Sequence, residues 1–333
     1  MLHAVVGMVV LLGVAWLVSE NRRVIHWRLI VAGVALQIVI ALLMLKAAPF
    51  RQLFLGLNAM VGALETATRA GTSFVFGYLG GGPLPFTETT PGGSFCLAFQ
   101  ALPLVLIIGA LTALFYYWRI LPKVVQAFSW LLRTTMGIGG ALGVVASGCI
   151  FLGMIEAPLL IRPYLVRMTR SELFAMMATG LSCIAGTMLV LYATVLQKVI
   201  PDALGHILTA SIIHAPAALA VASIIVPETE EQTLGGEISS YEASSAMDAL
   251  TKGTWDGLKI LVNIVALLIV FVALVKLANI GLGELPDIAG APLTLERMLG
   301  LLLAPVVWLI GVPWQEAITA GSLMGIKIVL NEF

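Results

Sequence analysis

The feature that most constrains this chain is a series of long apolar runs that contain almost no charged residues. A helix needs about 20 mostly apolar residues to cross the hydrocarbon core of a bilayer. Runs of this kind lie near residues 4–18, 29–45, 95–118, 173–196, 208–226 and 258–277. Soluble proteins carry about 25% charged residues, whereas this chain carries 11% and is 60% hydrophobic. We therefore expect an all-α polytopic membrane protein with about six spans.

Composition also excludes several functional classes. The 18 basic and 18 acidic residues give a net charge of zero, so nothing indicates a nucleic-acid partner. Three cysteines in apolar surroundings and four scattered histidines give no metal site and no disulfide framework. The chain lacks the Gly-x4-Gly-Lys-Ser/Thr loop that cradles phosphates, which argues against an ATP-driven pump. No organic cofactor is expected.

The basic residues predict how the chain is oriented. Arg22, Arg23 and Arg28 lie between the first two apolar runs, and residues 119–133 carry three more after the third run. Loops rich in Arg and Lys stay in the cytoplasm, so both segments are predicted cytoplasmic and the N-terminus periplasmic. Since the first basic cluster follows residues 4–18 instead of preceding them, that run is a true span and not a secretory signal.

The uncharged run 134–155 does not fit a simple crossing. Basic residues lie on both sides of it, so both ends are predicted cytoplasmic. A re-entrant hairpin over about residues 134–165 satisfies this, and six glycines in the run suit a tight turn. The alternative is one ordinary span with a misread topology. A hairpin also predicts a cavity, because irregular backbone at membrane depth must be buried or line a wet space.

These elements divide the chain into four predicted parts. Residues 1–93 form a scaffold of two spans and an interfacial helix, the amphipathic segment 54–67. Residues 94–226 form the transport core with the third span, the hairpin and spans four and five. Residues 227–257 read as a polar linker because they are rich in Ser, Gly and Glu. Residues 258–333 hold the sixth span and an incomplete second hairpin.

Two carboxylates lie in apolar surroundings. A carboxylate at hydrocarbon level costs several kcal/mol unless it is paired or hydrated, so it is a functional candidate by default. Glu156 follows the long uncharged run, and Glu332 lies beside Asn331 near the end of the chain. The structural alternatives are a glutamate at a helix end that reaches water and an exposed tail. A secondary transporter is favoured over an intramembrane enzyme, since the polar groups that an enzyme would cluster are scattered here.

Several sequence blocks carry a family resemblance. Gly325-Ile-Lys327-Ile-Val-Leu-Asn331-Glu332-Phe333 resembles the Gly-x-Lys-x3-Asn-Glu-Phe signature of concentrative nucleoside transporters. Glu156-Ala-Pro-Leu-Leu-Ile-Arg-Pro-Tyr164 and Met168-Thr-Arg-Ser-Glu-Leu173 are also similar to that family. So are shorter blocks at 71–77, 184–186, 215–220 and 227–230, so that the resemblance covers essentially the whole chain.

The resemblance implies a fold of eight spans, interfacial helices and two re-entrant hairpins, assembled as a homotrimer in the bacterial inner membrane. Such proteins move nucleosides into the cell, driven by a sodium or proton gradient. The first hairpin and a broken fourth span contact the nucleobase, and the second hairpin and seventh span hold the ribose. The substrate-binding residues implied for this chain are Glu156, Met154, Ile155 and Met188 on the base side, and Asn331 and Glu332 on the ribose side.

Two departures from the family pattern bear on substrate and coupling ion. The family usually has Gly-Gln-Ser/Thr-Glu where this chain has Gly153-Met154-Ile155-Glu156, so a pyrimidine preference does not follow. Sodium-coupled members use Asn and Ser side chains where this chain has Cys149 and Cys183, beside Ile184. Sodium prefers hard oxygen ligands over thiols, so protons are favoured over Na⁺ as the coupling ion. Glu156 and Glu332 are the candidate titrating groups.

A third departure is that the sequence stops at Phe333, inside the family signature. A second hairpin that begins near Trp314 and turns near Asn331-Glu332 would then be cut at its tip. We expect an incomplete carrier on this basis. The alternative is a nonfunctional fragment of such a transporter, and a remote one is an intramembrane enzyme.

Overall fold

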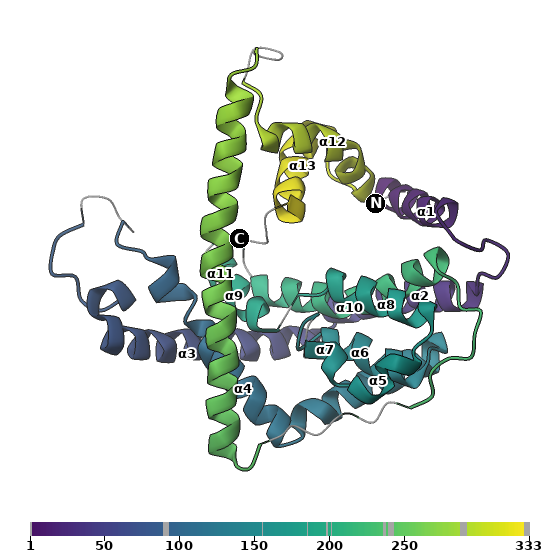
Figure 1. The fold of residues 1–333 in the computed structure, drawn as a ribbon, viewed down its shortest axis with the longest axis horizontal. Helices are drawn as coiled ribbons and strands as arrows, with labels where there is room; N and C mark the ends of the chain where they lie inside the picture. Colours follow the sequence, from purple (N-terminus) through teal and green to yellow (C-terminus); the bar gives the residue numbers. More distant parts are fainter. Residues whose placement is uncertain are drawn as a thin grey trace. The chain divides into compact units, whose positions relative to one another are not determined.

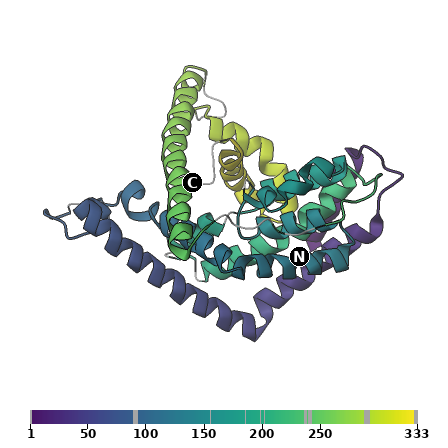
Figure 2. The same cartoon turned by 60° about the horizontal axis from the view of Figure 1, so that its bottom comes forward.

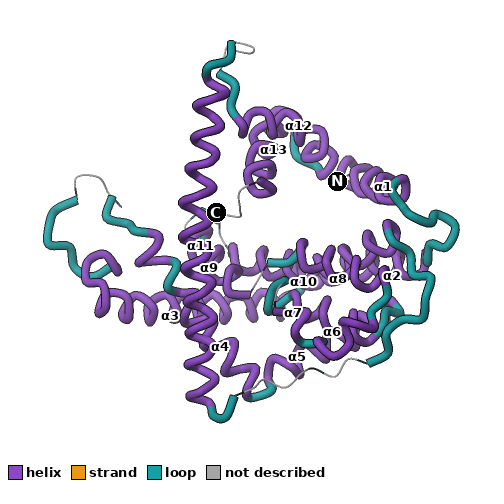
Figure 3. The backbone as a smooth tube through the Cα atoms, in the orientation of Figure 1, coloured by secondary structure: helices purple, strands orange, loops and turns teal. Residues whose placement is uncertain are grey.

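The computed structural model describes residues 2–88, 93–154, 156–184, 186–197, 199–200, 202–235, 238, 243–286 and 292–329. All regular secondary structure in these ranges is helical, as Figure 3 shows. The chain forms two compact units. The larger unit is Val18–Leu261, and the smaller one combines Met1–Leu17 with Val262–Phe333. Each unit is described by itself.

The helices of the larger unit are shown in Figure 1. They are α2 (Trp27–Lys46), α3 (Ala48–Phe76), η1 (Gly77–Gly80), η2 (Leu97–Ala101), α4 (Leu104–Tyr117), α5 (Ile120–Met136), α6 (Gly140–Cys149), α7 (Glu156–Leu159), η3 (Arg162–Arg167), α8 (Arg170–Ser182), α9 (Gly186–Leu196) and α10 (Ala203–Ile225). The smaller unit holds α1 (Leu2–Leu17), α12 (Leu295–Ile310) and α13 (Trp314–Val329), and α11 (Ala246–Gly283) begins in the larger unit and continues into the smaller one.

Four of the described helices are long and apolar enough to cross a bilayer: α2, Leu97–Tyr117, α10 and α11. The pair α12 and α13 adds a fifth if it counts as one span, and α1 is a shorter apolar helix. This confirms the all-helical membrane class that the apolar runs predict. The number of spans stays a prediction, because the test rests on length and composition alone.

The core of the larger unit is built around α6. All ten of its residues are buried, and it packs against α5, α7 and α8. Glycine, alanine and serine are frequent in α6, so neighbouring helices approach its backbone closely. Helices α2 and α10 form a second tight pair, in which Gly33 lies against the carbonyl of Pro216. Helices α2 and α3 meet at a sharp corner at Ala47, where the backbone is extended (Figure 2).

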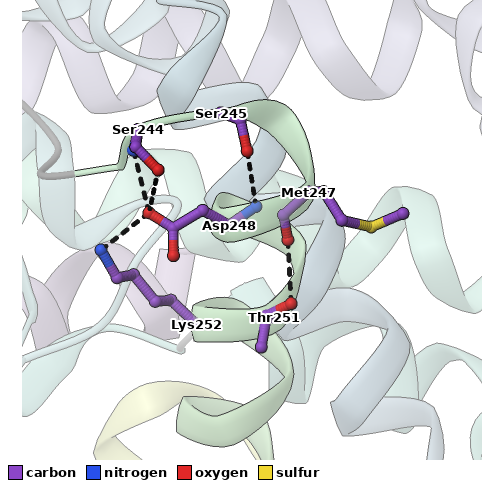
Figure 4. Close-up of polar contacts among 6 residues, drawn as sticks. All are labelled: Ser244, Ser245, Met247, Asp248, Thr251 and Lys252. Atoms are coloured by element: carbon purple, nitrogen blue, oxygen red, sulfur yellow. Dashed lines mark hydrogen bonds and ion pairs between the residues drawn. The ribbon is translucent and has the colours of Figure 1, made fainter.

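The start of α11 corrects the predicted linker. We expected a linker to residue 257 and a span from 258, but α11 begins at Ala246. Ser245 Oγ accepts a hydrogen bond from the backbone N–H of Asp248 at 3.2 Å, and Asp248 Oδ2 accepts one from Ser244 N at 2.9 Å (Figure 4). Lys252 Nζ also donates to Asp248 Oδ2, at 2.9 Å. Ser245-x-x-Asp248 is a helix-start signal of the capping-box type, which the polar composition of the segment hid.

The predicted fourth span is two helices. Helix α8 ends at Ser182 and α9 begins at Gly186, so the run 173–196 is broken in its middle. Helix α8 starts with a capping box formed by Thr169 and Glu172. An unbroken span is therefore wrong, whereas the break that the family resemblance implied is present.

Glu172 links the start of α8 to the segment that follows α10 through buried hydrogen bonds. Its side chain is 1% exposed, and it accepts hydrogen bonds from Thr169 N at 3.1 Å, Thr233 N at 2.9 Å and Thr233 Oγ1 at 2.6 Å. Thr169 Oγ1 in turn donates to Glu228 at 2.6 Å. Because these bonds join the start of α8 to the segment after α10, we define Thr169, Glu172 and Thr233 as the carboxylate clamp. The blocks 168–173 and 227–230 thereby acquire a structural explanation.

The smaller unit contains a sharply bent helix pair. Helices α12 and α13 differ in direction by 116° at a break over residues 311–313, and they pack closely through Gly300 and Gly321. Helix α13 begins at Trp314, where we expected the first arm of the second hairpin to start, and α12 is a separate helix before it. The second hairpin itself stays a prediction. The expected tip at Asn331-Glu332 lies outside the described residues.

Candidate functional site

Two helix breaks in the larger unit pack directly against each other. The first separates α6 from α7, and the second separates α8 from α9. A Cβ placed on Gly186 would collide with the backbone carbonyl of Phe151, and one placed on Gly180 would lie 3.0 Å from Cβ of Met154. The first break therefore packs tightly on the end of α8 and the start of α9, with Gly186 against the Phe151 backbone and Gly180 against the Met154 side chain.

The first break reverses the chain. Gly153 has a φ of +118°, which side-chain-bearing residues rarely adopt. Beyond it, α7 folds back on α6, and a Cβ on Gly148 would lie 3.3 Å from Cβ of Ala157 and 2.6 Å from a methyl of Leu160. This return gives the segment the shape that the hairpin prediction requires. Its insertion into a bilayer stays a prediction.

Helix α10 supplies a polar group to the first break. Ser211 Oγ donates to the backbone carbonyl of Ile150 at 3.3 Å, and Ser211 is 1% exposed. Buried carbonyls that leave a helix end need such a partner. Ser211 does not stand out in the sequence. The available signal was a hydroxyl inside the otherwise apolar run 208–226, which no local rule connects to a residue 61 positions away.

Glu156 lines a cavity of about 230 Å³. Helix α4, the α6–α7 turn and the first part of α11 form its walls, and Thr112, Tyr116 and Asp256 add polar groups to an otherwise apolar lining. Asp256 also pairs with Lys259, with 3.0 Å between Nζ and Oδ1. None of the described side chains gives a hydrogen bond to the Glu156 carboxylate. Glu156 thus lines a partly open cavity, in which its carboxylate can accept hydrogen bonds from a ligand.

A glycine contact holds α4 and α11 together beside this cavity. A Cβ on Gly253 would lie 2.5 Å from the Gly109 carbonyl oxygen, and one on Gly109 would lie 2.8 Å from the Gly253 carbonyl oxygen. A Cβ on Gly257 would lie 3.0 Å from Cα of Leu106. Gly253-x3-Gly257 is the small-residue spacing that lets two membrane helices approach closely. We name Gly109, Gly253 and Gly257 the glycine crossing.

The remaining predicted substrate residues are only partly described. Met154 lies at the first break and is 53% exposed, and Met188 lies two residues into α9 and is half-buried. Ile155, Asn331 and Glu332 lie outside the described residues. The structure thus brings Met154 to the place where the two breaks meet, and it says nothing of the ribose side.

The residues predicted for cation coupling do come together. Cys149 ends α6 and is fully buried, Cys183 follows α8, and the two thiols share a hydrogen bond. Cys183 Sγ also donates to the Gly180 carbonyl at 3.0 Å. Ile184 continues the second break and is half-buried. Within the described part of the chain, no three His, Cys, Asp or Glu side chains are grouped to hold a metal ion.

Three family matches together cover most of the chain. Residues 6–79 match the family described as Na⁺ dependent nucleoside transporter N-terminus, and residues 206–333 match its C-terminus. Residues 98–198, which contain both helix breaks, match a gate family described as nucleoside recognition. The fold and the matched families define a membrane transport protein and not an enzyme.

Individual relatives and solved structures are also transport proteins. The chain is 36% identical to the transporter YutK of Bacillus subtilis, over all of the chain and 80% of that protein. It is 34% identical to the nucleoside permease NupC of Helicobacter pylori, over all of the chain and 78% of that protein. The structure of CNTnw in an inward-facing substrate-bound state matches 99% of the chain and 77% of CNTnw, with 34% identity and a TM-score of 0.89. The chain belongs to the concentrative nucleoside transporter family.

Proposed function

We propose that this protein takes up nucleosides across the cytoplasmic membrane, driven by a cation gradient. The observation that carries the proposal is the pair of packed helix breaks, with Met154 between them and Glu156 on a cavity beside them. Irregular backbone in an apolar protein supplies polar groups at membrane depth, which is where secondary transporters bind their substrates. Membership of a nucleoside transporter family supplies the substrate class.

The base side of the site is formed by Glu156, Met154, Ile155 and Met188. Glu156 has unused acceptor capacity toward its cavity, so it accepts a hydrogen bond from a base amino or imino group. Met154 and Ile155 offer contact area without hydrogen bonds. A site of that kind discriminates weakly between bases. We therefore propose that both purine and pyrimidine nucleosides are accepted.

The ribose side is assigned to Glu332 with Asn331. A carboxylate accepts two hydroxyl hydrogen bonds, which fits the vicinal hydroxyls of a ribose. The assignment rests on the match of residues 206–333 to the family C-terminus. It predicts that 2′-deoxynucleosides bind more weakly than ribonucleosides.

Protons are proposed as the coupling ion instead of sodium. The coupling region presents two thiols, and soft sulfur ligands hold Na⁺ poorly. The matched family descriptions name Na⁺ dependence, so the departure belongs to this chain and rests on Cys149 and Cys183. Glu156 and Glu332 are the proposed proton carriers.

Orientation and assembly complete the proposal. The N-terminus lies in the periplasm, because Arg22, Arg23 and Arg28 mark the first loop as cytoplasmic. Residues 134–165 enter the bilayer from the cytoplasmic side and return to it as a re-entrant hairpin. The protein assembles as a homotrimer, which crosslinking in native membranes would test.

Uptake of radiolabelled adenosine and uridine by the protein in proteoliposomes tests the function. Glu332→Gln should lower uptake about 10- to 100-fold, since a lost hydrogen bond to a charged group costs about 1.5–3 kcal/mol. Glu316→Gln, an exposed glutamate in the first turn of α13, is the matched control and should transport normally. Equal uptake by both variants would contradict the ribose assignment. Failure of a stable preparation to bind any nucleoside would favour a nonfunctional member of the family.

Ion replacement tests the coupling. With sodium replaced by choline, uptake should persist, and a protonophore should abolish it. Cys149→Asn combined with Cys183→Ser restores the oxygen ligands of sodium-coupled members and should make uptake depend on sodium. Sodium dependence of the unaltered protein would overturn the proton proposal.

A further inference from the structure

Two of the three cysteines in the sequence meet at the packed helix breaks. Cys149 is the last residue of α6, and Cys183 is the first residue after α8. They belong to different segments of the chain, yet their thiols share a hydrogen bond, and neither is in a disulfide. The third cysteine, Cys96, lies at the start of η2. The fold therefore creates a dithiol, which we define as Cys149 and Cys183.

The two sulfurs of the dithiol differ in access. Cys149 is 0% exposed and belongs to the apolar cluster around α6. Cys183 packs against that cluster but is only half-buried, and Leu181, two residues before it, is 77% exposed. A small reagent therefore reaches Cys183 first, with Cys149 directly behind it.

The surroundings favour a product without charge. Cys183 Sγ donates a hydrogen bond to the Gly180 carbonyl at 3.0 Å, which holds that sulfur beside the end of α8. The nearby charged group that acts on Cys149 is the Glu156 carboxylate, which opposes a second negative charge. A metal complex of two thiolates with a monovalent ion would be anionic, and a buried uncompensated charge is costly. A disulfide is neutral and needs only the two sulfurs.

We propose that the dithiol is a site of reversible oxidation, in which a small uncharged peroxide converts Cys149 and Cys183 into a disulfide. The Cys183 sulfur loses its proton and attacks peroxide as a thiolate. The O–O bond breaks, a sulfenic acid forms on Cys183, and the departing hydroxide takes up the thiol proton and leaves as water. The Cys149 sulfur then attacks the sulfenic sulfur, the S–S bond forms as the S–O bond breaks, and a second water leaves with the Cys149 proton. Hydrogen peroxide is thus the only oxidant required.

The disulfide would change the candidate site directly. It would bind the end of α6 covalently to the break between α8 and α9, beside the contacts of Phe151 with Gly186 and Met154 with Gly180. It would also remove both thiols from the cation-coupling region. The effect on uptake rests on the proposed function, whereas formation of the bond does not. We expect uptake to fall on oxidation and to recover with dithiothreitol.

The test is mass spectrometry of the purified full chain carrying Cys96→Ser, so that the dithiol holds the only cysteines. After treatment with hydrogen peroxide, denaturation and iodoacetamide, the expected product is unalkylated and about 2 Da lighter than the reduced protein. Proteolysis should yield one peptide pair joined through Cys149 and Cys183. Alkylation of both cysteines after peroxide, or an oxygen-bearing Cys183 without a crosslink, would overturn the proposal.

A second variant separates the two proposals. Cys183→Ser in the Cys96→Ser background cannot form the bond, and whatever uptake it retains should be insensitive to peroxide. The Cys96→Ser protein should lose uptake with peroxide over the same time in which the crosslinked peptide pair forms. If the crosslink forms but no nucleoside is transported before treatment, the proposed function fails and the dithiol proposal stands. If uptake is normal and no crosslink forms, the dithiol proposal fails and the proposed function stands.

Discussion

Glu172 and Glu156 are both carboxylates in apolar surroundings, they lie in neighbouring sequence blocks, and the structure uses them in opposite ways. Glu172 is buried and accepts three hydrogen bonds from Thr169 and Thr233. Glu156 faces a cavity, and no described side chain donates to it. A carboxylate whose acceptors are all used stabilises the fold, whereas one with spare acceptors is available to a ligand. Burial alone therefore does not mark a functional carboxylate.

The largest expected effect comes from removing the Glu172 carboxylate. Glu172→Ala leaves three buried donors without an acceptor, and each costs about 1–3 kcal/mol, so we expect a loss of roughly 3 kcal/mol or more. Thermal unfolding of the detergent-solubilised protein measures it. Glu231→Ala is the matched control, because Glu231 is exposed on the same segment. An unchanged melting temperature for Glu172→Ala would mean that the clamp is not structural.

Removing the charge of Glu156 should affect uptake and leave stability nearly unchanged, the opposite of the result expected for Glu172. Glu156→Gln keeps the shape of the side chain and removes its charge, so we expect uptake to fall about 10- to 100-fold with the melting temperature nearly unchanged. Uptake and thermal unfolding are measured on the same preparation. Destabilisation by Glu156→Gln with normal uptake of the folded fraction would reverse the comparison with Glu172.

Thr233→Val tests one bond of the clamp. The Thr233 hydroxyl contacts Glu172 at 2.6 Å and the Arg167 carbonyl at 3.0 Å. A hydroxyl bond to a charged group contributes about 1.5–3 kcal/mol, and the remaining backbone bond of Thr233 should limit the loss to the lower end. Thermal unfolding is the measurement, and Thr229→Val at an exposed position is the control. A loss as large as that of Glu172→Ala would show that the hydroxyl alone holds the clamp.

The smallest expected effect concerns the base contacts near Glu156. Met154→Gln introduces the amide that the family usually carries, and one neutral hydrogen bond is worth about 0.5–1.5 kcal/mol. The ratio of uridine to adenosine uptake should therefore change about 2- to 10-fold. Competition between the two labelled nucleosides measures the ratio. A constant ratio would place Met154 outside base recognition, whereas Met177→Gln, exposed on α8, should leave the ratio unchanged.

The sequence predicts the helical membrane class because runs of apolar residues report directly on the bilayer. It also marks Glu156 as unusual, since a charge after 22 uncharged residues is visible without a structure. It does not separate Glu156 from Glu172, because the difference lies in donors from Thr233, 61 positions away. Ser211 was hidden for the same reason, whereas the family resemblance had already placed Cys149 and Cys183 in one region. The start of α11 was missed although its signal, Ser245-x-x-Asp248, is local.

The glycine crossing has a consequence for inherited variation. Every single-nucleotide missense change in a glycine codon replaces glycine by a residue with a Cβ, and at Gly109, Gly253 and Gly257 that atom would lie 2.5–3.0 Å from the backbone of the facing helix. No such change is conservative there, because α4 and α11 must separate to admit even an alanine. Separation would move Thr112 on α4 away from Asp256 on α11, and both line the cavity of Glu156. Any missense change at these three glycines, which lie far from the signature blocks, is thus expected to change the shape of the site.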